Sequence, residues 1–236
     1  MTNVRDDLAP TGVLRASINL GNPVLAKGTP DEPGGVTVDI ARELARRLDV
    51  PLELVCFDAA RKSFEAMTTG QADLCFLAID PARAGEVAFT APYVVIEGVF
   101  AVPADSALST VDEVDRPGVR IGVKKGSAYD LYLARTLQHA TVVQGEEGVD
   151  VFLAEGLEAG AGIRQPTTTF VAAHPETRLI EERFMQIQQA VGTTKSRLPE
   201  TVAYLHALVE DLKASGFIAT SLEAAGQGDA QVAPPA

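Results

Sequence analysis

The stretch Leu-Cys-Phe-Leu-Ala-Ile-Asp-Pro-Ala-Arg, residues 74–83, joins an apolar run to a short polar motif. A continuous apolar run of this kind is typical of a strand buried in a parallel sheet. Further along the chain, residues 89–93 read Phe-Thr-Ala-Pro-Tyr. An arginine just after a buried strand can hold a ligand carboxylate by paired, charge-assisted hydrogen bonds. Arg83 is therefore the first candidate for a binding residue.

Strand and helix patterns alternate on both sides of this stretch. Short apolar or alternating runs predict strands over residues 14–18, 52–57, 73–79, 120–123, 141–143, 160–163 and 186–191. Apolar residues at helical spacing predict helices over residues 40–48, 64–67, 128–137, 149–157, 167–173 and 199–212. Strands that alternate with helices define an α/β fold.

Two extended segments mark predicted crossings between two α/β lobes. The apolar run 94–102 is broken at Pro103, and the strand 186–191 returns toward the first lobe. We therefore predict that lobe 1 comprises residues 1–102 and 192–226 and that lobe 2 comprises residues 103–191. Residues 227–236 follow the last helical pattern and are predicted to be a disordered tail.

Composition and charge exclude several functions. The chain has 236 residues, 46% of them apolar, and a net charge of −12. Without a clustered basic face, an acidic chain is unsuited to nucleic acid. The longest apolar runs are too short to cross a bilayer, so we expect no direct membrane insertion. The polar opening lacks a secretory signal pattern, so we expect a cytoplasmic protein, or a periplasmic one if a signal has been removed.

The remaining reactive residues form no recognisable catalytic or metal motif. Cys56 and Cys75 lie in apolar runs and are predicted to be buried free thiols. The three histidines, His139, His174 and His206, lack the spacing of metal ligands. No nucleophile elbow or phosphate-binding glycine loop is present. We therefore expect no metal, no cofactor and no catalytic residue.

Several motifs occur together in one order. They are residues 38–41 (Val-Asp-Ile-Ala), 80–83, 89–93, 123–127 followed by Tyr129, and 192–195 before the last long helix. In this order they resemble solute-binding protein family 3, the amino-acid-type substrate-binding proteins of ABC transporters, over residues 12–224. The resemblance implies the type 2 periplasmic-binding-protein fold, with two α/β lobes joined by a two-segment hinge, which closes on a small ligand.

Elementary electrostatics gives Gly126 and Ser127 a possible role in lobe 2. They precede a predicted helix, whose positive end and backbone N–H groups favour an anion, and the Ser127 hydroxyl adds a donor. Arg83 would bind a carboxylate from lobe 1. Two structural alternatives stay open, since such an arginine is often a surface ion-pair partner and Lys-Gly-Ser is often a turn with a helix N-cap.

Three departures from the family pattern bear on the ligand. Ala78 and Asp80 stand where the family usually has a threonine or serine that helps bind the carboxylate. Asn22-Pro-Val-Leu replaces the aromatic that usually stacks on the ligand, so Phe57 would have to supply an apolar wall unless it is buried in the core.

The third departure concerns charge. Arg164 stands where the family usually has an aspartate for the ligand's ammonium group. A positive residue there favours an anion or dicarboxylate over an amino acid. An amino acid would still fit if Asp80 or Glu97 replaced the missing aspartate. The alternative for Glu97 is a solvated hinge residue.

The sequence therefore predicts a monomeric substrate-binding protein for a small carboxylate-bearing solute, with an ABC transporter permease as its partner. An enzymatic alternative stays open, because cyclohexadienyl and arogenate dehydratases resemble the same fold. In that case Asp80, Glu97 or Glu155 would be the proton donor. A ligand-sensing module is the third possibility, although the first eleven residues are too few for a DNA-binding segment.

Overall fold

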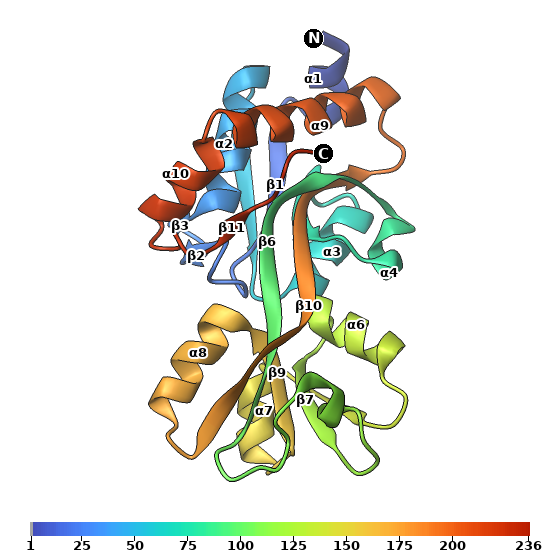
Figure 1. Ribbon diagram of the computed structural model, residues 1–236. Coiled ribbons are helices and arrows are strands. Elements are labelled where there is room, and N and C mark those ends of the chain that lie inside the picture. The colour runs from blue at the N-terminus through green and yellow to red at the C-terminus, as the bar shows by residue number, and fades with distance from the viewer. Residues whose placement is uncertain (1) are drawn as a thin grey trace. The chain divides into compact units, whose positions relative to one another are not determined.

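The chain forms two compact units in a computed structural model that describes residues 2–236. Unit 1 comprises Met1–Val95 and Gln188–Ala236, and unit 2 comprises Ile96–Ile187. The predicted α/β organisation is confirmed. The boundaries fall earlier than the predicted positions after residues 102 and 191, because both crossings lie inside long strands. These are β6 (Val87–Pro103) and β10 (Thr177–Thr194), so Pro103 marks the end of a strand and not the crossing itself (Figure 1).

Unit 1 is built on a mixed sheet with strand order β4-β1-β5-β10-β6. Its other strands are β1 (Leu14–Asn19), β4 (Leu52–Phe57) and β5 (Leu74–Ala78), with a small hairpin of β2 (Lys27–Gly28) and β3 (Pro33–Gly34). Strand β1 runs parallel to β4 and β5, and β10 runs antiparallel to β5. Since Asn19 pairs with Phe57, the ends of β1 and β4 coincide at one edge of the sheet.

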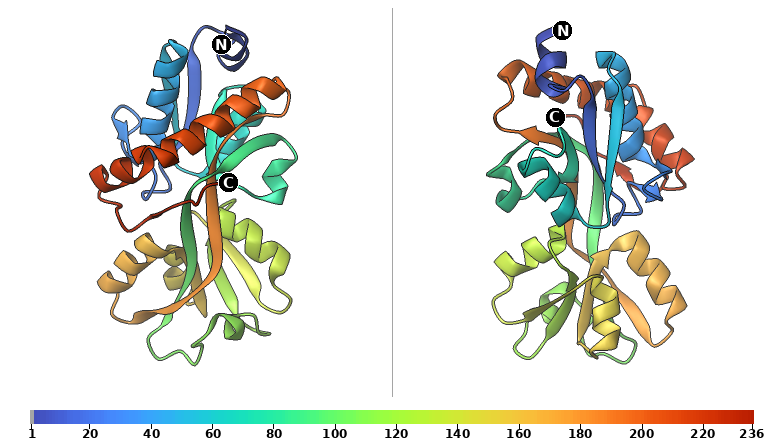
Figure 2. Two further views of the ribbon diagram at one scale, coloured as in Figure 1. Left: turned by 45° about the horizontal axis from the view of Figure 1, so that its top comes forward. Right: turned by 180° about the vertical axis from the view of Figure 1, so that it is seen from behind.

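Helices from both segments of unit 1 accompany this sheet (Figure 2). They are α1 (Thr2–Leu8), α2 (Val36–Leu48), α3 (Ala60–Thr68), α4 (Pro81–Ala84), α9 (Pro199–Ala214) and α10 (Phe217–Ala224). Ile40 and Leu44, spaced four apart on α2, are both fully buried. Burial of each such side chain stabilises the fold by about 1.5–3 kcal/mol. Of the helices in residues 2–236, none is long and apolar enough to span a bilayer.

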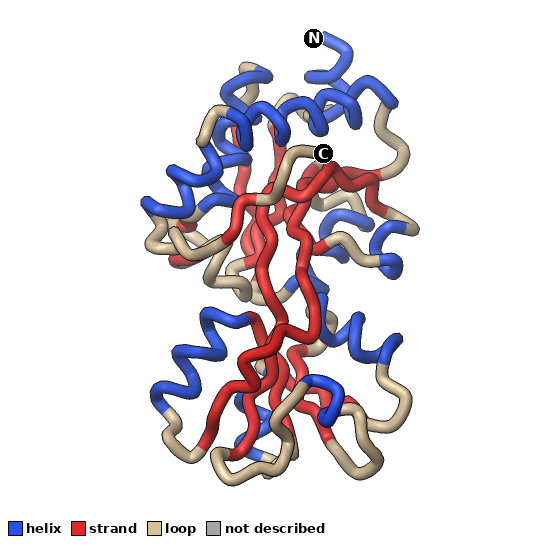
Figure 3. The backbone as a smooth tube through the Cα atoms, viewed as in Figure 1, coloured by secondary structure: helices blue, strands red, loops and turns tan. Residues whose placement is uncertain are grey.

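Unit 2 has the strand order β6-β9-β7-β8. Its strands are drawn in red and its helices in blue in Figure 3. Its own elements are β7 (Arg120–Lys124), β8 (Thr141–Gly145), β9 (Ala159–Ile163), α5 (Val111–Val114), α6 (Ala128–Thr136), α7 (Gly148–Ala154) and α8 (Arg164–Ala173). Helix α7 lies very close to the sheet, because a Cβ atom on Gly122 would come within 2.4 Å of the Gly148 carbonyl oxygen. Strands β7, β8 and β9 are parallel, so their carboxyl ends share an edge.

The C-terminal segment differs from the predicted disordered tail. Gln231 and Val232 form strand β11, which pairs antiparallel with Val95 and Val94 of β6. The next residue, Ala233, is buried and donates its N–H to the Tyr93 carbonyl at 3.0 Å. The pairing satisfies backbone hydrogen-bonding groups along β6. The local composition of residues 227–236 does not show that such a partner strand is available. The segment is an ordered part of unit 1.

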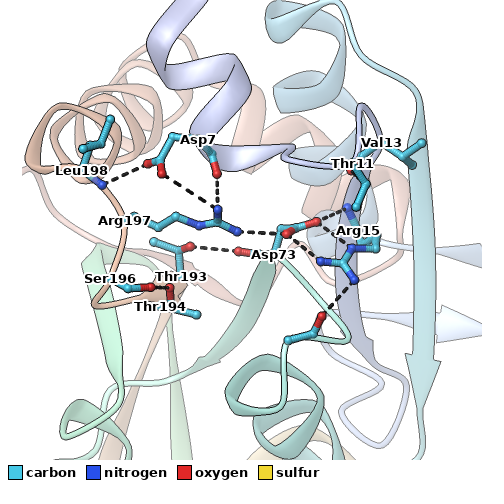
Figure 4. A network of polar contacts seen from close by, with 11 residues as sticks. Asp7, Thr11, Val13, Arg15, Asp73, Thr193, Thr194, Ser196, Arg197 and Leu198 are labelled. Carbon is cyan, nitrogen blue, oxygen red and sulfur yellow. Dashed lines mark hydrogen bonds and ion pairs between the residues drawn. The ribbon is translucent and has the colours of Figure 1, made fainter.

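A buried polar network fastens the N-terminal helix to unit 1 (Figure 4). Asp73 is 1% exposed and binds Arg15 through both carboxylate oxygens. Arg197 binds Asp73 and the carbonyl of Asp7 at the end of α1. Thr193 donates to the Asp73 carbonyl at 2.8 Å. The network joins segments from both parts of the discontinuous unit 1.

Candidate functional site

Unit 1 has a cavity at the carboxyl ends of two of its parallel strands, β1 and β4. Open α/β sheets bind ligands at this edge. The cavity has a volume of about 360 Å³ and is lined by Leu20, Pro30, Cys56, Phe57, Asp58 and Lys62. Phe57 is only half-buried and forms part of the wall, so it is available as the apolar surface that the sequence suggested. Lys62 and Asp58 add an ion pair at 2.7 Å.

Arg83 is a buried cation just after the carboxyl end of β5. Asp80 begins helix α4, and its side chain accepts a hydrogen bond from the N–H of Ala82 at 2.8 Å. This turn brings Arg83 back toward the strand, where Nη1 donates to the Ala78 carbonyl at 3.1 Å. Arg83 is 3% exposed, which excludes the alternative of a surface residue. Burial lowers the pKa of Arg83, and the nearby charge of Asp80 opposes that effect. Ala78 has no side-chain hydroxyl to offer a ligand, and its backbone carbonyl binds Arg83 instead.

Gly126 and Ser127 begin helix α6 as a capping motif. Ser127 Oγ accepts a hydrogen bond from the N–H of Asp130 at 3.0 Å, and the N–H of Gly126 donates to Asp130 Oδ2 at 2.7 Å. Gln144 also donates to Asp130 at 2.9 Å. The N-cap alternative is thus observed. The carboxylate of Asp130 already occupies the positive end of α6, and its negative charge would repel a bound anion. The predicted anion site at Gly126 and Ser127 stays a prediction.

Arg164 and Glu97 form an ion pair inside unit 2. Arg164 follows β9, and its Nε donates to Glu97 Oε2 at 2.5 Å. Arg183 on β10 donates to the other oxygen of Glu97 at 2.9 Å, and Arg164 Nη2 donates to the Glu181 carbonyl at 2.8 Å. Arg164 is therefore already paired with a carboxylate, which it shares with Arg183. Arg164, predicted to be a second anion-binding residue, is thus bound to Glu97. Glu97 in turn is an ion-pair residue of unit 2 and not the solvated hinge residue that was the alternative.

The three carboxylates considered as proton donors have unsuitable surroundings. Burial raises the pKa of Glu97, but hydrogen bonds and charges from Arg164 and Arg183 outweigh it and hold that pKa below its usual range. Asp80 is engaged as a helix cap. Glu155 is exposed at the end of α7. A general acid for neutral pH needs a raised pKa in a dry site.

The two cysteines are free thiols, as expected. Ile18 on β1 pairs with Cys56 on β4, and Ser17 on β1 pairs with Cys75 on β5. Strand β1 therefore lies between them, and two strand spacings separate the cysteines by about 10 Å. A disulfide needs Cα atoms within about 7 Å, so Cys56 and Cys75 are too far apart to form a disulfide with each other.

Sequence reasoning missed a second charged pair in unit 2. Lys124, the last residue of β7, is 9% exposed, and its Nζ contacts the carboxylate of Glu147, which follows β8. Both residues lie where neighbouring parallel strands end. The signal was available in the sequence, since each follows an apolar strand, but the pairing depends on the strand register.

Sequence comparison identifies the family. Residues 19–224 match the bacterial extracellular solute-binding proteins, family 3, and the chain belongs to this family. No curated protein sequence matches it.

Solved structures share the fold. A mutant of ArgBP from T. maritima has a TM-score of 0.76 at 22% identity and covers 94% of this chain and 98% of that one. The arginine-bound amino acid ABC transporter substrate-binding protein AbpA from Streptococcus pneumoniae has a TM-score of 0.77 at 19% identity, with coverages of 94% and 98%. AncCDT-1, an ancestral amino acid-binding protein and precursor of cyclohexadienyl dehydratase, has a TM-score of 0.74 at 20% identity, with coverages of 93% and 98%. The likeness confirms the type 2 periplasmic-binding-protein fold.

Proposed function

We propose that this chain is the solute-binding receptor of an ABC transporter and that its solute is a small molecule with a carboxylate group. The observation that carries the proposal is the burial of Arg83 at the carboxyl end of β5. A guanidinium presents two parallel N–H donors that match a carboxylate, and a low-dielectric surrounding strengthens that contact. The Ala78 carbonyl orients the guanidinium, which reduces the entropy lost on binding.

Family membership supports the transport role. AbpA is an amino acid ABC transporter substrate-binding protein and was solved with L-arginine bound. By analogy, the partner of this chain is an ABC transporter permease, and the chain acts as a monomer. The solute is an amino acid or a dicarboxylate, and the Glu97–Arg164 pair weakens the case for a dicarboxylate because the Arg164 guanidinium already has an anionic partner.

A ligand screen of the purified chain tests this proposal. The probes are the twenty L-amino acids, succinate, glutarate and prephenate, with thermal unfolding as the first readout and calorimetry for every hit. A solute at 100 times its Kd stabilises the protein by about 2.7 kcal/mol, which is a shift of several degrees. We expect at least one carboxylate to produce this shift.

Variants assign the contact to Arg83. Arg83→Ala removes the guanidinium, and Arg83→Lys keeps a charge without the planar fork. We expect both to lose at least tenfold in affinity, and Arg42→Ala, an exposed residue on α2, to retain it. Arg164→Ala tests the second arginine in the same way. A folded Arg83→Lys protein with full affinity would overturn the role of Arg83, and a chain that binds no carboxylate would overturn the function.

The dehydratase alternative is supported by the likeness to AncCDT-1, a precursor of cyclohexadienyl dehydratase. Two observations weigh against it, because the pKa of Glu97 is lowered and Glu155 is exposed. Prephenate is kept in the screen for that reason. If absorbance measurements detected turnover of prephenate, the dehydratase function would be preferred over the receptor function.

A further inference from the structure

Unit 2 contains a cavity that the proposed function does not use. The cavity has a volume of about 290 Å³, and β6, β10, α5 and α6 all contribute lining residues. These residues lie between positions 100 and 184, so the whole cavity belongs to unit 2. Small-molecule sites begin at about 300 Å³. The cavity therefore has room for a compact ligand with a single ring.

The cavity lies toward the amino ends of two parallel strands. Helix α5 precedes β7, and Gln138 and His139 precede β8, and both segments line the cavity. Strands β7 and β8 have five residues each, which is a span of about 16 Å. Open α/β sheets bind ligands at the other, carboxyl edge. A ligand in this cavity would therefore occupy a site of its own.

Three aromatic side chains line the cavity. The rings of Phe100 and Phe184 stack with their centroids 4.2 Å apart, and the ring of Tyr132 is tilted against Phe184 at 6.1 Å. Phe100 is 2% exposed, whereas Phe184 and Tyr132 are only partly buried. The face of an aromatic ring is partly negative and attracts a cation within about 6 Å of its centre. The lining is therefore suited to a cation with an apolar body.

The formal charge of the lining is negative. Asp112 and Asp115 line the cavity, and among the residues that the structure describes no lysine or arginine does. Asp115 accepts hydrogen bonds at 2.8–2.9 Å from three backbone N–H groups, those of Gln138, His139 and Ala140. Burial raises the pKa of Asp115, but these hydrogen bonds outweigh it and hold that pKa below its usual range. Asp115 is therefore ionised at neutral pH.

Neighbouring charges leave this negative field in place. Asp112 is exposed in the first turn of α5. Glu182 on β10 reaches the start of the same helix, where its Oε2 accepts the N–H of Val111 at 3.4 Å. The nearby cation, Arg116, already pairs with Glu113 at 3.1 Å. A positive ligand at this end of unit 2 would thus meet carboxylates and few competing cations.

We propose that the cavity binds a small organic cation, an ammonium group on a single ring or a short alkyl body, as a second ligand of the chain. The body packs among the aromatic rings and the buried side chains of Val114 and Leu133, and the ammonium group lies toward Asp112 and Asp115. A carboxylate is disfavoured, because it would face two like charges. The proposal goes beyond the proposed function, whose solute is a carboxylate.

Three probes that differ in one polar group test the proposal. Benzylammonium, benzyl alcohol and benzoate share a ring and carry a positive, a neutral and a negative group. Calorimetry measures affinity, and amide chemical shifts locate the bound probe. All measurements are made at pH 8, because His139 also lines the cavity and a protonated ring would oppose a cation. We expect benzylammonium to bind about tenfold more tightly than benzyl alcohol, with shifts at residues 111–116 and 132–139. Benzoate should not shift these residues.

Variants assign the contacts to the charge and to the ring. Asp112→Asn removes a charge at constant size, and Tyr132→Leu removes a ring. We expect each to weaken benzylammonium binding by about fivefold, and Tyr132→Phe, which keeps the ring, to retain it. Asp150→Asn is the matched control, because Asp150 is exposed on α7, outside the cavity, and its loss changes the net charge equally. It should retain full affinity, as should Arg83→Ala.

Three results would overturn the proposal. Equal affinities for benzylammonium and benzyl alcohol would remove the role of the charge. Equal losses in Asp112→Asn and Asp150→Asn would reduce binding to an effect of net charge. Amide shifts away from the lining residues, or none at millimolar benzylammonium, would show that the cavity takes no cation. None of these results bears on carboxylate binding by Arg83, which the ligand screen tests separately.

Discussion

Arg197 and Asp73 form an ion pair at 2.9 Å although they lie 124 residues apart in the sequence (Figure 4). Their side chains are 13% and 1% exposed. The pair joins the end of β10 to the start of β5. Its strength depends on burial, since a charge that loses its partner inside a protein is not rehydrated.

Asp73→Asn should therefore destabilise the protein. The substitution removes the nearer counter-charge of the buried Arg197 guanidinium, which keeps only the Asp7 carboxylate at 4.0 Å, and weakens the contacts of Arg15. We expect a loss of about 3–5 kcal/mol in the free energy of unfolding, measured by urea denaturation. Arg42→Ala, which breaks an exposed pair with Asp39, should change it by less than about 0.5 kcal/mol. Equal effects of the two variants would contradict the structural role of the network.

Glu43 should make stability depend on pH in the acid range. Hydrogen bonds from Arg46 and Arg47 lower its pKa from 4.5 to about 2. Because the folded-state pKa is the lower one, the contribution is fully present above pH 4.5 and is lost as the pH falls toward 2. The unmodified protein should therefore have a higher Tm than Glu43→Gln at about pH 7, and the gap should narrow by about pH 3.

Thermal denaturation followed by circular dichroism measures that gap. Glu65→Gln, an exposed residue of α3, is the control and should have little effect at either pH. A gap for Glu43→Gln that stays constant with pH would show that the two arginines do not stabilise the ionised form.

Gly122→Ala should destabilise unit 2. The new methyl group would lie 2.4 Å from the Gly148 carbonyl oxygen, which is backbone and has little freedom to move. Overpacking of this kind costs about 1–3 kcal/mol. At Gly85, a Cβ atom meets no described atom within 4 Å, and the backbone is helical with φ −61°. Gly85→Ala should instead stabilise by about 0.4–1 kcal/mol. Chemical denaturation of both variants checks the opposite signs.

Cys75 should resist thiol reagents until the protein unfolds. Burial raises its pKa to about 12, and the thiolate is the reactive form. Burial also raises the pKa of Cys56, but that side chain lines the unit 1 cavity and should react first. A DTNB time course with and without urea measures both, and Cys75→Ser assigns the slow step. Fewer than two thiols in urea without reductant would contradict the free state of the cysteines.

Local patterns predicted most of the fold. The strands 52–57 and 74–78 were found because apolar residues cluster over the length of a buried strand, and α2 was found from Ile40, Leu44 and Leu48. The outer parts of β6 and β10 were missed for a physical reason. Residues such as Glu181 and Glu182 on β10 are exposed, so this part of the strand carries no apolar signal. Strand β11 exists only through its pairing with β6.

The candidate site was predicted less completely, because charge pairing is a property of the fold. Arg83 was identified from its place after a strand, yet its burial depends on the turn that Asp80 begins. Glu97 and Arg164 are 67 residues apart, and nothing in the sequence joins them.

The discontinuity of unit 1 sets an order of folding during synthesis. Strand β5 pairs with residues of β10 from Gly192 to Gln189, and these leave the ribosome only after all of unit 2 has been made. Unit 2 is therefore the first unit whose chain is complete, although it is second in the sequence. Until β10 arrives, one edge of β5 is exposed in the nascent chain, and unpaired strand edges promote aggregation. We therefore expect the early half of unit 1 to be the part of the nascent chain most prone to aggregation.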